Sequence, residues 1–262
     1  MSKIPEDAIQ CLDKGFVRLV DSMGGDEAIV QAARVSYGKG TTKLSQDRGL
    51  IRYLMRHRHT TPFEMVEFKF HCKMPIFVAR QWVRHRTANI NEYSLRYSEA
   101  RDEFYYPDPE HIQFQSALNK QGRMGDVPDD LKKKVQDYFK EISNRSFEIY
   151  SELNTAGVSR ELARAILPVN LYTEWYWKND LHNLLHFVGL RSDSHAQYEI
   201  RVFSDAMAES VKAVAPFAWE AYQDYAVSGL RFSKIEQGLL EQNLPERVID
   251  DIIEDVVYQI TA

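Results

Sequence analysis

Two segments alternate between apolar and polar residues, which is the pattern of strands that bury one face of a sheet. The first covers residues 15–23. The second covers residues 64–72, in which Val66, Phe68 and Phe70 fall on one side and charged residues lie between them. Both segments are therefore predicted to be half-buried strands.

Between and after these strands, apolar residues recur with the spacing of a helix. One helix is predicted at 26–37, where Asp26 can cap the first turn, and another at 45–56. Pro75 suits the first position of a third helix, from 76 to about 86, because its missing N–H has no partner there in any helix.

The rest of the first half is predicted to be mostly irregular. Residues 103–106 read as a short strand that Pro107 ends. Residues 38–42 form a glycine-containing loop that lacks the Gly-Lys-Thr ending of a phosphate-binding loop. Residues 119–128 are polar, contain glycine, and predict another loop.

From residue 129 onward the pattern predicts helix throughout. The expected helices are 129–155, 160–167, 176–190, 194–214, 217–226, 234–241 and 245–260. Because the strands come early and the helices late, the fold class is predicted to be α+β. We expect a single domain over residues 1–262, with a small antiparallel sheet in the N-terminal half, a largely helical C-terminal half and a helical tail at about 231–262.

Composition limits the function. The 262 residues carry 33 basic and 38 acidic side chains, a net charge of −5, which argues against a protein that binds nucleic acid. The two cysteines, Cys11 and Cys72, are too few and too far apart for a disulfide framework or a cysteine zinc site. We find no signal-peptide pattern and no apolar run that could cross a bilayer, so we expect a cytoplasmic protein without a membrane partner.

Local charge departs from this total. Five arginines but only two glutamates lie in residues 80–101. On the predicted helix, Gln81, Arg84 and His85 have i, i+3, i+4 spacing and share one face. Guanidinium groups bind phosphate through paired hydrogen bonds, so this segment is a candidate pocket for a nucleotide phosphate. The alternative is a solvated helix end whose arginines form ion pairs with the neighbouring glutamates.

The order of residues in this segment is more specific than its charge. The run RHRTANINEYSLR, which begins at Arg84, resembles the signature Arg-His-Arg-x-x-Ser-x-Asn-Glu-x-Ser-x-Arg of the flavin-dependent thymidylate synthases. The matching positions are Arg84, His85, Arg86, Asn91, Glu92, Ser94 and Arg96. One position departs from the signature, with Asn89 in place of its first serine.

Other segments resemble the same family in the same order. Residues 58–64 resemble its His-x-Thr-Pro-Phe-Glu element, although Met65 stands where a histidine is often found. Arg164 matches an arginine that binds the substrate. Residues 190–197, which end at Gln197, match the block that bears the substrate-activating arginine, here Arg191. The resemblance covers roughly residues 16–219 and does not explain the tail.

The resemblance implies an enzyme that methylates deoxyuridine monophosphate (dUMP) to thymidylate (dTMP) with FAD as its cofactor. It implies 5,10-methylenetetrahydrofolate as the one-carbon donor, NADPH as the reductant, and no protein nucleophile. It also implies a homotetramer whose active sites are shared between subunits.

The resemblance also implies roles for individual residues. Those expected to bind dUMP are Gln81, Arg84, Glu92, Ser94, Arg96, Arg164 and Arg191. Those expected to bind FAD are His59, Thr61, Arg84, His85, Arg86, Glu92, Asp180, His182 and His186. Arg191 would be catalytic, because it places positive charge where the N3-deprotonated uracil forms.

Without the resemblance, some of these residues fit different roles. Arg191 precedes a predicted helix start, a place that favours anions, but it could instead pair with Asp193. His182 and His186 have i, i+4 spacing and could share a metal, yet Asn183 breaks the zinc-protease pattern and no third ligand stands nearby in sequence. The rival functions are a nucleotide-binding module without catalysis, a nucleic-acid-binding protein and a metallohydrolase.

Overall fold

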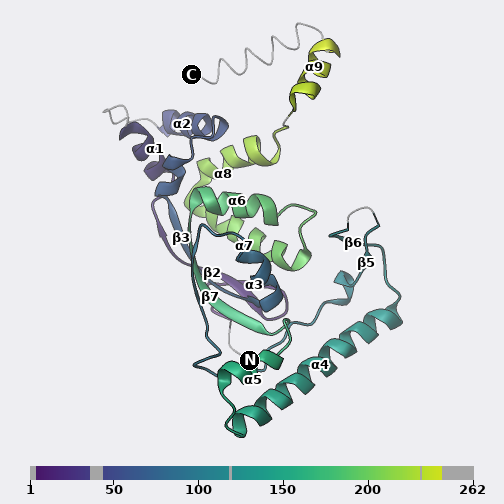
Figure 1. Cartoon of the computed structure of the whole chain (residues 1–262). Helices are drawn as coiled ribbons and strands as arrows, with labels where there is room; N and C mark the ends of the chain where they lie inside the picture. Colours follow the sequence, from purple (N-terminus) through teal and green to yellow (C-terminus); the bar gives the residue numbers. More distant parts are fainter. Residues whose placement is uncertain (1–3, 36–43, 118–119, 231, 244–262) are drawn as a thin grey trace. The chain divides into compact units, whose positions relative to one another are not determined.

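The computed structural model describes residues 4–35, 44–117, 120–230 and 232–243 (Figure 1). The chain divides into two compact units, one of residues 1–22 and 68–210 and the other of residues 23–67 and 211–262. The loop predicted at 38–42 and the helix predicted at 245–260 lie outside the described residues. The single domain stays a prediction.

A five-stranded sheet in the order β1-β2-β3-β7-β4 forms the centre of the first unit. Its strands are β1 (Ile9–Cys11), β2 (Gly15–Met23), β3 (Glu67–Pro75), β7 (Tyr172–Asp180) and β4 (Asn89–Glu92). β1 pairs antiparallel with β2, and β4 pairs antiparallel with β7. Together with the helices around it, this sheet confirms the α+β class.

Clear alternation predicted the first two long strands. β2 has the predicted bounds. In β3, Phe68, Phe70 and Cys72 are fully buried while the residues between them are partly exposed. This strand begins at Glu67 rather than at residue 64, because Thr61–Met65 forms a short 3-10 helix, η1, that has a proline in its first turn.

The helix predicted at 176–190 is wrong in its first part. Residues Tyr172–Asp180 form β7, and helix α6 begins only at Leu181 and ends at Arg191. Trp175 and Trp177 are buried to within 1% of full coverage, whereas Tyr176 between them is 46% exposed. This period of two is the strand pattern, so the signal for β7 was present in the sequence.

β4 replaces part of the turn predicted after the third helix. All four of its residues are exposed, so no apolar alternation marks it. It forms because β7 offers an antiparallel ladder, in which Ile90 lies opposite Trp177 and Glu92 lies opposite Trp175. The preceding helix, α3 (Ile76–Trp82), ends four residues short of the prediction.

An aromatic core joins three helices to one face of the sheet. Trp82 of α3 stacks on Phe187 of α6 at 4.9 Å between ring centroids, and it meets Trp175 of β7 edge-on at 5.3 Å. Phe203 of helix α7 (Tyr198–Val214) lies 6.0 Å from Trp82. Each buried aromatic ring of this kind contributes roughly 1.5–3 kcal/mol, which fixes the ends of α3 and α6.

A second apolar cluster holds the long helix α4 (Asp129–Thr155), whose bounds are as predicted. Tyr150 of α4 and Ala163 of α5 (Arg160–Ala163) pack with Phe104 and Leu171. The strand predicted at 103–106 is reduced to one isolated bridge, between Phe104 and Leu171. The helix predicted at 160–167 is α5 followed by a 3-10 turn, η3 (Arg164–Ile166).

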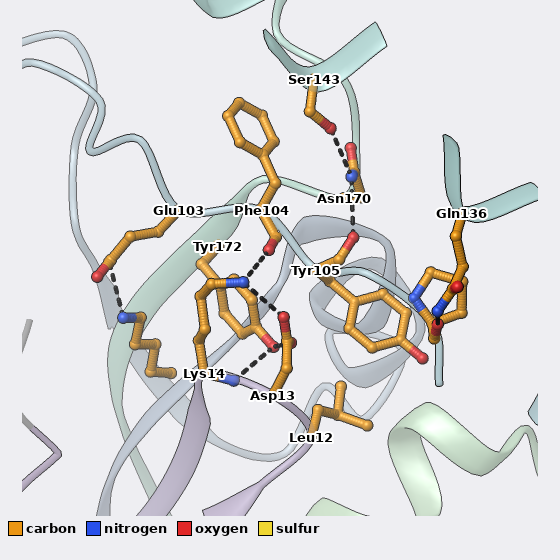
Figure 2. Close-up of polar contacts among 12 residues, drawn as sticks. Leu12, Asp13, Lys14, Glu103, Phe104, Tyr105, Gln136, Ser143, Asn170 and Tyr172 are labelled. Carbon is orange, nitrogen blue, oxygen red and sulfur yellow. Dashed lines mark hydrogen bonds and ion pairs between the residues drawn. The ribbon is translucent and has the colours of Figure 1, made fainter. Parts of the chain in front are cut away.

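Polar contacts reinforce this cluster from both sides (Figure 2). Asn170 Nδ2 donates to the backbone oxygen of Tyr105 and to Ser143 Oγ on α4, each at 3.0 Å. Near the β1–β2 turn, Tyr172 OH donates to Asp13 Oδ1 at 2.6 Å. The two buried bonds of Asn170 thus tie α4 to the segment that begins at residue 103, and the bond of Tyr172 ties β7 to the β1–β2 turn.

A small hairpin lies in the predicted loop region. Its strands are β5 (Phe114–Gln115) and β6 (Arg123–Met124). The loop predicted at 119–128 therefore contains one strand that the sequence pattern did not reveal, because two residues carry no periodicity.

The second unit is helical. Its helices are α1 (Asp26–Val35), α2 (Leu44–Arg56), η1, α8 (Pro216–Tyr222), the π-helical turn η4 (Gln223–Val227) and α9 (Lys234–Asn243). Asp26 accepts hydrogen bonds from the backbone N–H groups of Phe217 and Ala218, so it caps α8 rather than its own helix as predicted. No helix among the described residues is long and apolar enough to cross a membrane.

Candidate active site

The predicted site residues lie on five segments. The first unit holds four of them. These are Gln81, Arg84, His85 and Arg86 at the end of α3, Glu92, Ser94 and Arg96 at β4, Arg164 at η3, and the segment of α6, with Asp180 as its N-cap and His182, His186 and Arg191 on the helix. The second unit holds His59 and Thr61, between α2 and η1.

The turn after α3 separates residues that the sequence placed on one helix face. The helix ends at Trp82. Two tight turns follow, in which the backbone N–H groups of Arg84 and His85 donate hydrogen bonds to the backbone oxygens of Gln81 and Trp82. His85 consequently points inward and is only 9% exposed, whereas Arg84 and Arg86 on either side of it are exposed. The predicted shared face is therefore wrong, and the turn instead buries the imidazole and presents the guanidinium groups to solvent.

Arg191, the last residue of α6, lies against this turn. Its Nε donates to His85 Nε2 at 3.0 Å, and its Nη2 donates to the backbone oxygen of Gln81 at 3.5 Å. The structure thus brings Arg191 against two predicted residues that precede it in the chain by 106 and 110 positions.

Two predictions for Arg191 are wrong. The next helix, α7, begins only at Tyr198, so Arg191 does not stand at a helix start but at the C-terminal end of α6, where a cation is favoured. The alternative partner, Asp193, instead accepts bonds from the backbone and ring nitrogens of His195 at 2.7 and 2.8 Å.

Among the residues that the structure describes, no carboxylate pairs with Arg191, whose side chain instead meets a histidine. Burial, helped by the charges of Arg191 and His186, lowers the pKa of His85 to about 4. At neutral pH this ring is uncharged, so its Nε2 accepts the bond and its proton sits on Nδ1. Burial also lowers the pKa of Arg191, but a guanidinium remains protonated in proteins.

Gln81 has a further partner that the sequence did not single out. Its Nε2 donates to Oε1 of Gln197, which precedes α7 and closes the sequence block that resembles the family around Arg191. A polar residue at the end of a matched block was the only available signal.

A second group of predicted residues lies at β4 and beyond it. Glu92 Oε1 accepts a bond from Thr173 Oγ1 of β7 at 2.6 Å. Ser94 Oγ accepts from the backbone N–H of Arg96 at 3.3 Å, and the exposed Arg96 guanidinium is 3.9 Å from Glu161 of α5. Arg164, on η3 just after α5, is partly exposed.

The ion-pair network considered as the alternative for this segment does not form among the described residues. Glu99 pairs with Arg160 at 3.1 Å, and Arg101 pairs with Glu174 at 3.1 Å. Within the described ranges, Arg84 and Arg86 have no ion pair, so their guanidinium groups are available to an anion.

Two of the α6 residues predicted to bind flavin differ in their surroundings. Asp180 caps α6, because its two carboxylate oxygens accept from the backbone and side-chain nitrogens of Asn183 at 2.9 and 2.7 Å. His186 is exposed and meets His85 edge-on at 5.9 Å between centroids. Asp180 thus has a structural role as a helix cap, whereas His186 adjoins the buried imidazole.

In the second unit, His59 follows a helix end that is strained. The N–H groups of Arg58 and His59 bond to the oxygens of Met55 and Leu54, the Schellman pattern of a helix C-terminus. Its left-handed position, usually glycine, is taken by Arg58 with φ of 55°. The turn brings the ring of His59 to 5.8 Å from that of Tyr53.

Two described cavities of the first unit, of about 720 and 610 Å³, adjoin Gln197. Neither cavity is lined by one of the residues that the sequence predicts for the site. No group of three or more His, Cys, Asp or Glu side chains that could hold a metal occurs among the residues that the structure describes.

Comparison with known proteins gives consistent matches. Residues 18–217 match the family described as thymidylate synthase complementing protein. A flavin-dependent thymidylate synthase of Rickettsia conorii is 54% identical over 247 residues, covering 89% of this chain and 84% of that protein. One from Ehrlichia ruminantium is 58% identical over 223 residues, covering 85% of this chain and 75% of that protein.

A solved structure is also similar. The UMP/dUMP methylase PolB from Streptomyces cacaoi, bound with 5-Br dUMP, has a TM-score of 0.75 and 34% sequence identity. The match covers 82% of this chain and 97% of that chain.

Proposed function

The chain belongs to the flavin-dependent thymidylate synthase family, and on that premise we propose that it converts dUMP to dTMP by reductive methylation. The one-carbon donor would be 5,10-methylenetetrahydrofolate, the reductant NADPH and the flavin FAD. A cytoplasmic location accompanies this proposal as an expectation.

The observation that carries the proposal is the partner of Arg191. Within the described part of the chain, its guanidinium is held by a neutral imidazole, that of His85, and by a backbone oxygen, and not by a carboxylate. Its charge is therefore oriented but not neutralised. A uracil that loses its N3 proton becomes an anion with an electron-rich C5, and an oriented cation stabilises that anion more than the neutral base. We propose that Arg191 activates dUMP in this way.

The cysteines support a reaction without a protein nucleophile. Burial raises the pKa of the Cys11 thiol to about 12. Burial also raises the pKa of Cys72, which is fully covered, well above its usual range. Neither side chain is a thiolate at neutral pH, and neither is exposed to a substrate.

The residues near β4 and α3 fit anionic ligands. Arg84 and Arg86 present exposed guanidinium groups, which suit the diphosphate of FAD. We propose that Arg84 also reaches dUMP, with Gln81, Glu92, Ser94, Arg96 and Arg164, and that His59, Thr61, His85, Glu92, Asp180, His182 and His186 adjoin the flavin. When bound, FAD would carry electrons between NADPH and the one-carbon unit.

We also propose that the active site is completed by other copies of the chain in a homotetramer. The contacts of the residues expected to bind dUMP include one group around Arg191 and another around Arg96 and Glu161. No described contact links these groups. A dUMP molecule that needs both could be bound between subunits.

The test is to mix the purified protein with FAD, NADPH, methylenetetrahydrofolate and dUMP and to measure dTMP. Appearance of dTMP that depends on added FAD is the expected result. Arg191→Ala should lower turnover by at least 100-fold, on the order of the loss when one oriented charge-stabilising group is removed, while the flavin absorption spectrum stays unchanged. Full activity of Arg191→Ala would contradict the role of this residue.

A further inference from the structure

Four side chains joined by hydrogen bonds connect the β5–β6 hairpin to the candidate site, and we call them the relay. In order, they are Arg123, Glu199, Gln197 and Gln81. Arg123 Nη2, on β6, donates to Oε2 of Glu199 at 2.6 Å. Gln197 Nε2 donates to the same oxygen at 2.8 Å. Gln81 Nε2 in turn donates to Gln197 Oε1. Arg123 and Glu199, which have no part in the proposed reaction, are thus connected to a residue of the candidate active site.

Glu199 is the residue whose charge state sets the direction of the hydrogen bonds in the relay. Its side chain is only 4% exposed. Although burial alone would raise its pKa, the hydrogen bond and charge of Arg123 hold the pKa of Glu199 below its usual range. Tyr105 OH donates to the second carboxylate oxygen at 3.1 Å, and burial together with Glu199 raises the pKa of Tyr105, so this group stays a donor. Glu199 is therefore ionised and can only accept hydrogen bonds.

Because Glu199 can accept hydrogen bonds but not donate them, it allows the side-chain amide of Gln197 only one orientation. A glutamine amide can usually be turned over, because its oxygen and nitrogen ends are nearly equal in shape. Gln197 must direct its NH₂ group to Glu199, which leaves its oxygen toward Gln81. Gln81 must then direct its own NH₂ group to Gln197, so its Oε1 is the end that is left for another donor.

We propose that Glu199, anchored by Arg123 and acting through Gln197, is a positioning residue that makes Gln81 present its side-chain oxygen to an N–H or O–H group of the pyrimidine nucleotide. The inference rests on the proposed function, in which Gln81 binds dUMP. Because the backbone oxygen of Gln81 also accepts a bond from Arg191, the same relay acts beside the group that activates the base.

The competing role is purely structural, since Arg123 also donates to the backbone oxygen of His111 at 2.8 Å and so secures the hairpin. Both roles predict that variants of Glu199 lose stability. A test must therefore measure recognition of the nucleotide, and it must do so by binding as well as by turnover.

The first measurement is the Kd of dUMP, determined by calorimetry for the wild-type protein and for Glu199→Gln, both loaded with FAD. The neutral amide of Gln at position 199 can donate a hydrogen bond to Gln197. The side-chain amide of Gln197 can then flip, so that its oxygen and NH₂ group exchange places. We expect the Kd and the KM for dUMP to rise about tenfold, the value of one hydrogen bond of ~1.4 kcal/mol, with a much smaller change in kcat. Gln197→Leu, which removes the relay without unpairing a buried charge from Arg123, should give the same rise if Glu199→Gln does not fold.

The matched control is Asn170→Ala, which removes two buried hydrogen bonds of the same unit outside the relay. It should lower the melting temperature without changing the KM for dUMP. Tyr105→Phe should likewise leave the KM unchanged, because Glu199 remains ionised.

Two substrate analogues identify the donor. N3-methyl-dUMP lacks the N3 proton, and 2′,3′-dideoxyuridine monophosphate lacks the 3′ hydroxyl. The penalty of Glu199→Gln should vanish with the analogue that lacks the donor read by Gln81. If wild-type protein binds dUMP and both relay variants bind it equally well, the inference is overturned while the proposed function stands; if wild-type protein does not bind dUMP, the proposed function itself fails.

Discussion

Replacing His85 by glutamine should make the stability of this protein less sensitive to acid. The imidazole is 9% exposed, accepts a bond from Arg191, and has a pKa of about 4 in the folded state against 6.5 for the free side chain. Since the folded-state pKa is lower, the unfolded chain binds a proton first as the pH falls. The stability that the neutral ring contributes is complete above pH 6.5 and is lost as the pH falls toward 4.

The magnitude follows from the difference of about 2.5 pKa units at 1.36 kcal/mol each, or roughly 3 kcal/mol over the whole window. Between pH 8 and pH 5 the loss is about 2 kcal/mol. His85→Gln keeps an acceptor for Arg191 but does not titrate, so its free energy of unfolding should fall by about 2 kcal/mol less than that of the wild type over the same interval.

The assay is urea unfolding followed by fluorescence at pH 8, 7, 6 and 5, at one protein concentration so that association does not differ between samples. His57→Gln serves as the control, because that ring is exposed and belongs to the second unit. Parallel pH curves for wild type and His85→Gln would refute the burial of a neutral imidazole against Arg191.

Further outcomes are expected elsewhere in the chain. Arg58→Gly should raise the free energy of unfolding by up to about 1 kcal/mol in urea titrations, because glycine accepts the left-handed backbone at φ of 55°; Arg58→Ala, which keeps a Cβ, should not, and equal effects would contradict the strain. Lys73→Met should lower the free energy of unfolding by about 3–5 kcal/mol, because the almost fully buried Glu103, 2.7 Å away, loses its cation. The double variant Lys73→Met with Glu103→Leu should lose much less of this free energy, and an additive loss would argue against the pairing. Trp82→Ala should cost about 3–5 kcal/mol by opening the aromatic core, and a change below 1 kcal/mol would place this ring outside it.

Local pattern was enough to predict many elements. The bounds of β2 and α4 and the start of α1 are as predicted, because apolar periodicity acts within a few residues of the chain. The segment of β7 was predicted wrongly although its pattern was readable. Its buried and exposed positions alternate, but only the three polar residues 178–180 separate its last aromatic residue from α6, so the sequence also fits one continuous helix.

Other features could not have been found from local pattern. β4 is fully exposed and exists because its backbone pairs with β7. The carboxylate of Asp26 is at a helix start, yet it caps α8, nearly 200 residues further along. Each of these depends on a partner that is distant in sequence, and no periodicity encodes such a partner.

In the candidate site, too, some features follow from the sequence and others only from the tertiary structure. The sequence by itself determined which residues were worth testing, because the order of Arg84, His85, Arg86, Glu92 and Ser94 carries family membership that composition does not. Only the tertiary structure decided how they are used. α3 ends at Trp82, and the turns after it bring His85 into the interior, where its ring meets Phe187 edge-on. This burial makes the imidazole neutral and a partner for Arg191. A pKa, a hydrogen-bond direction and an unneutralised charge depend on burial and on neighbours in space, and these are fixed only when the chain folds.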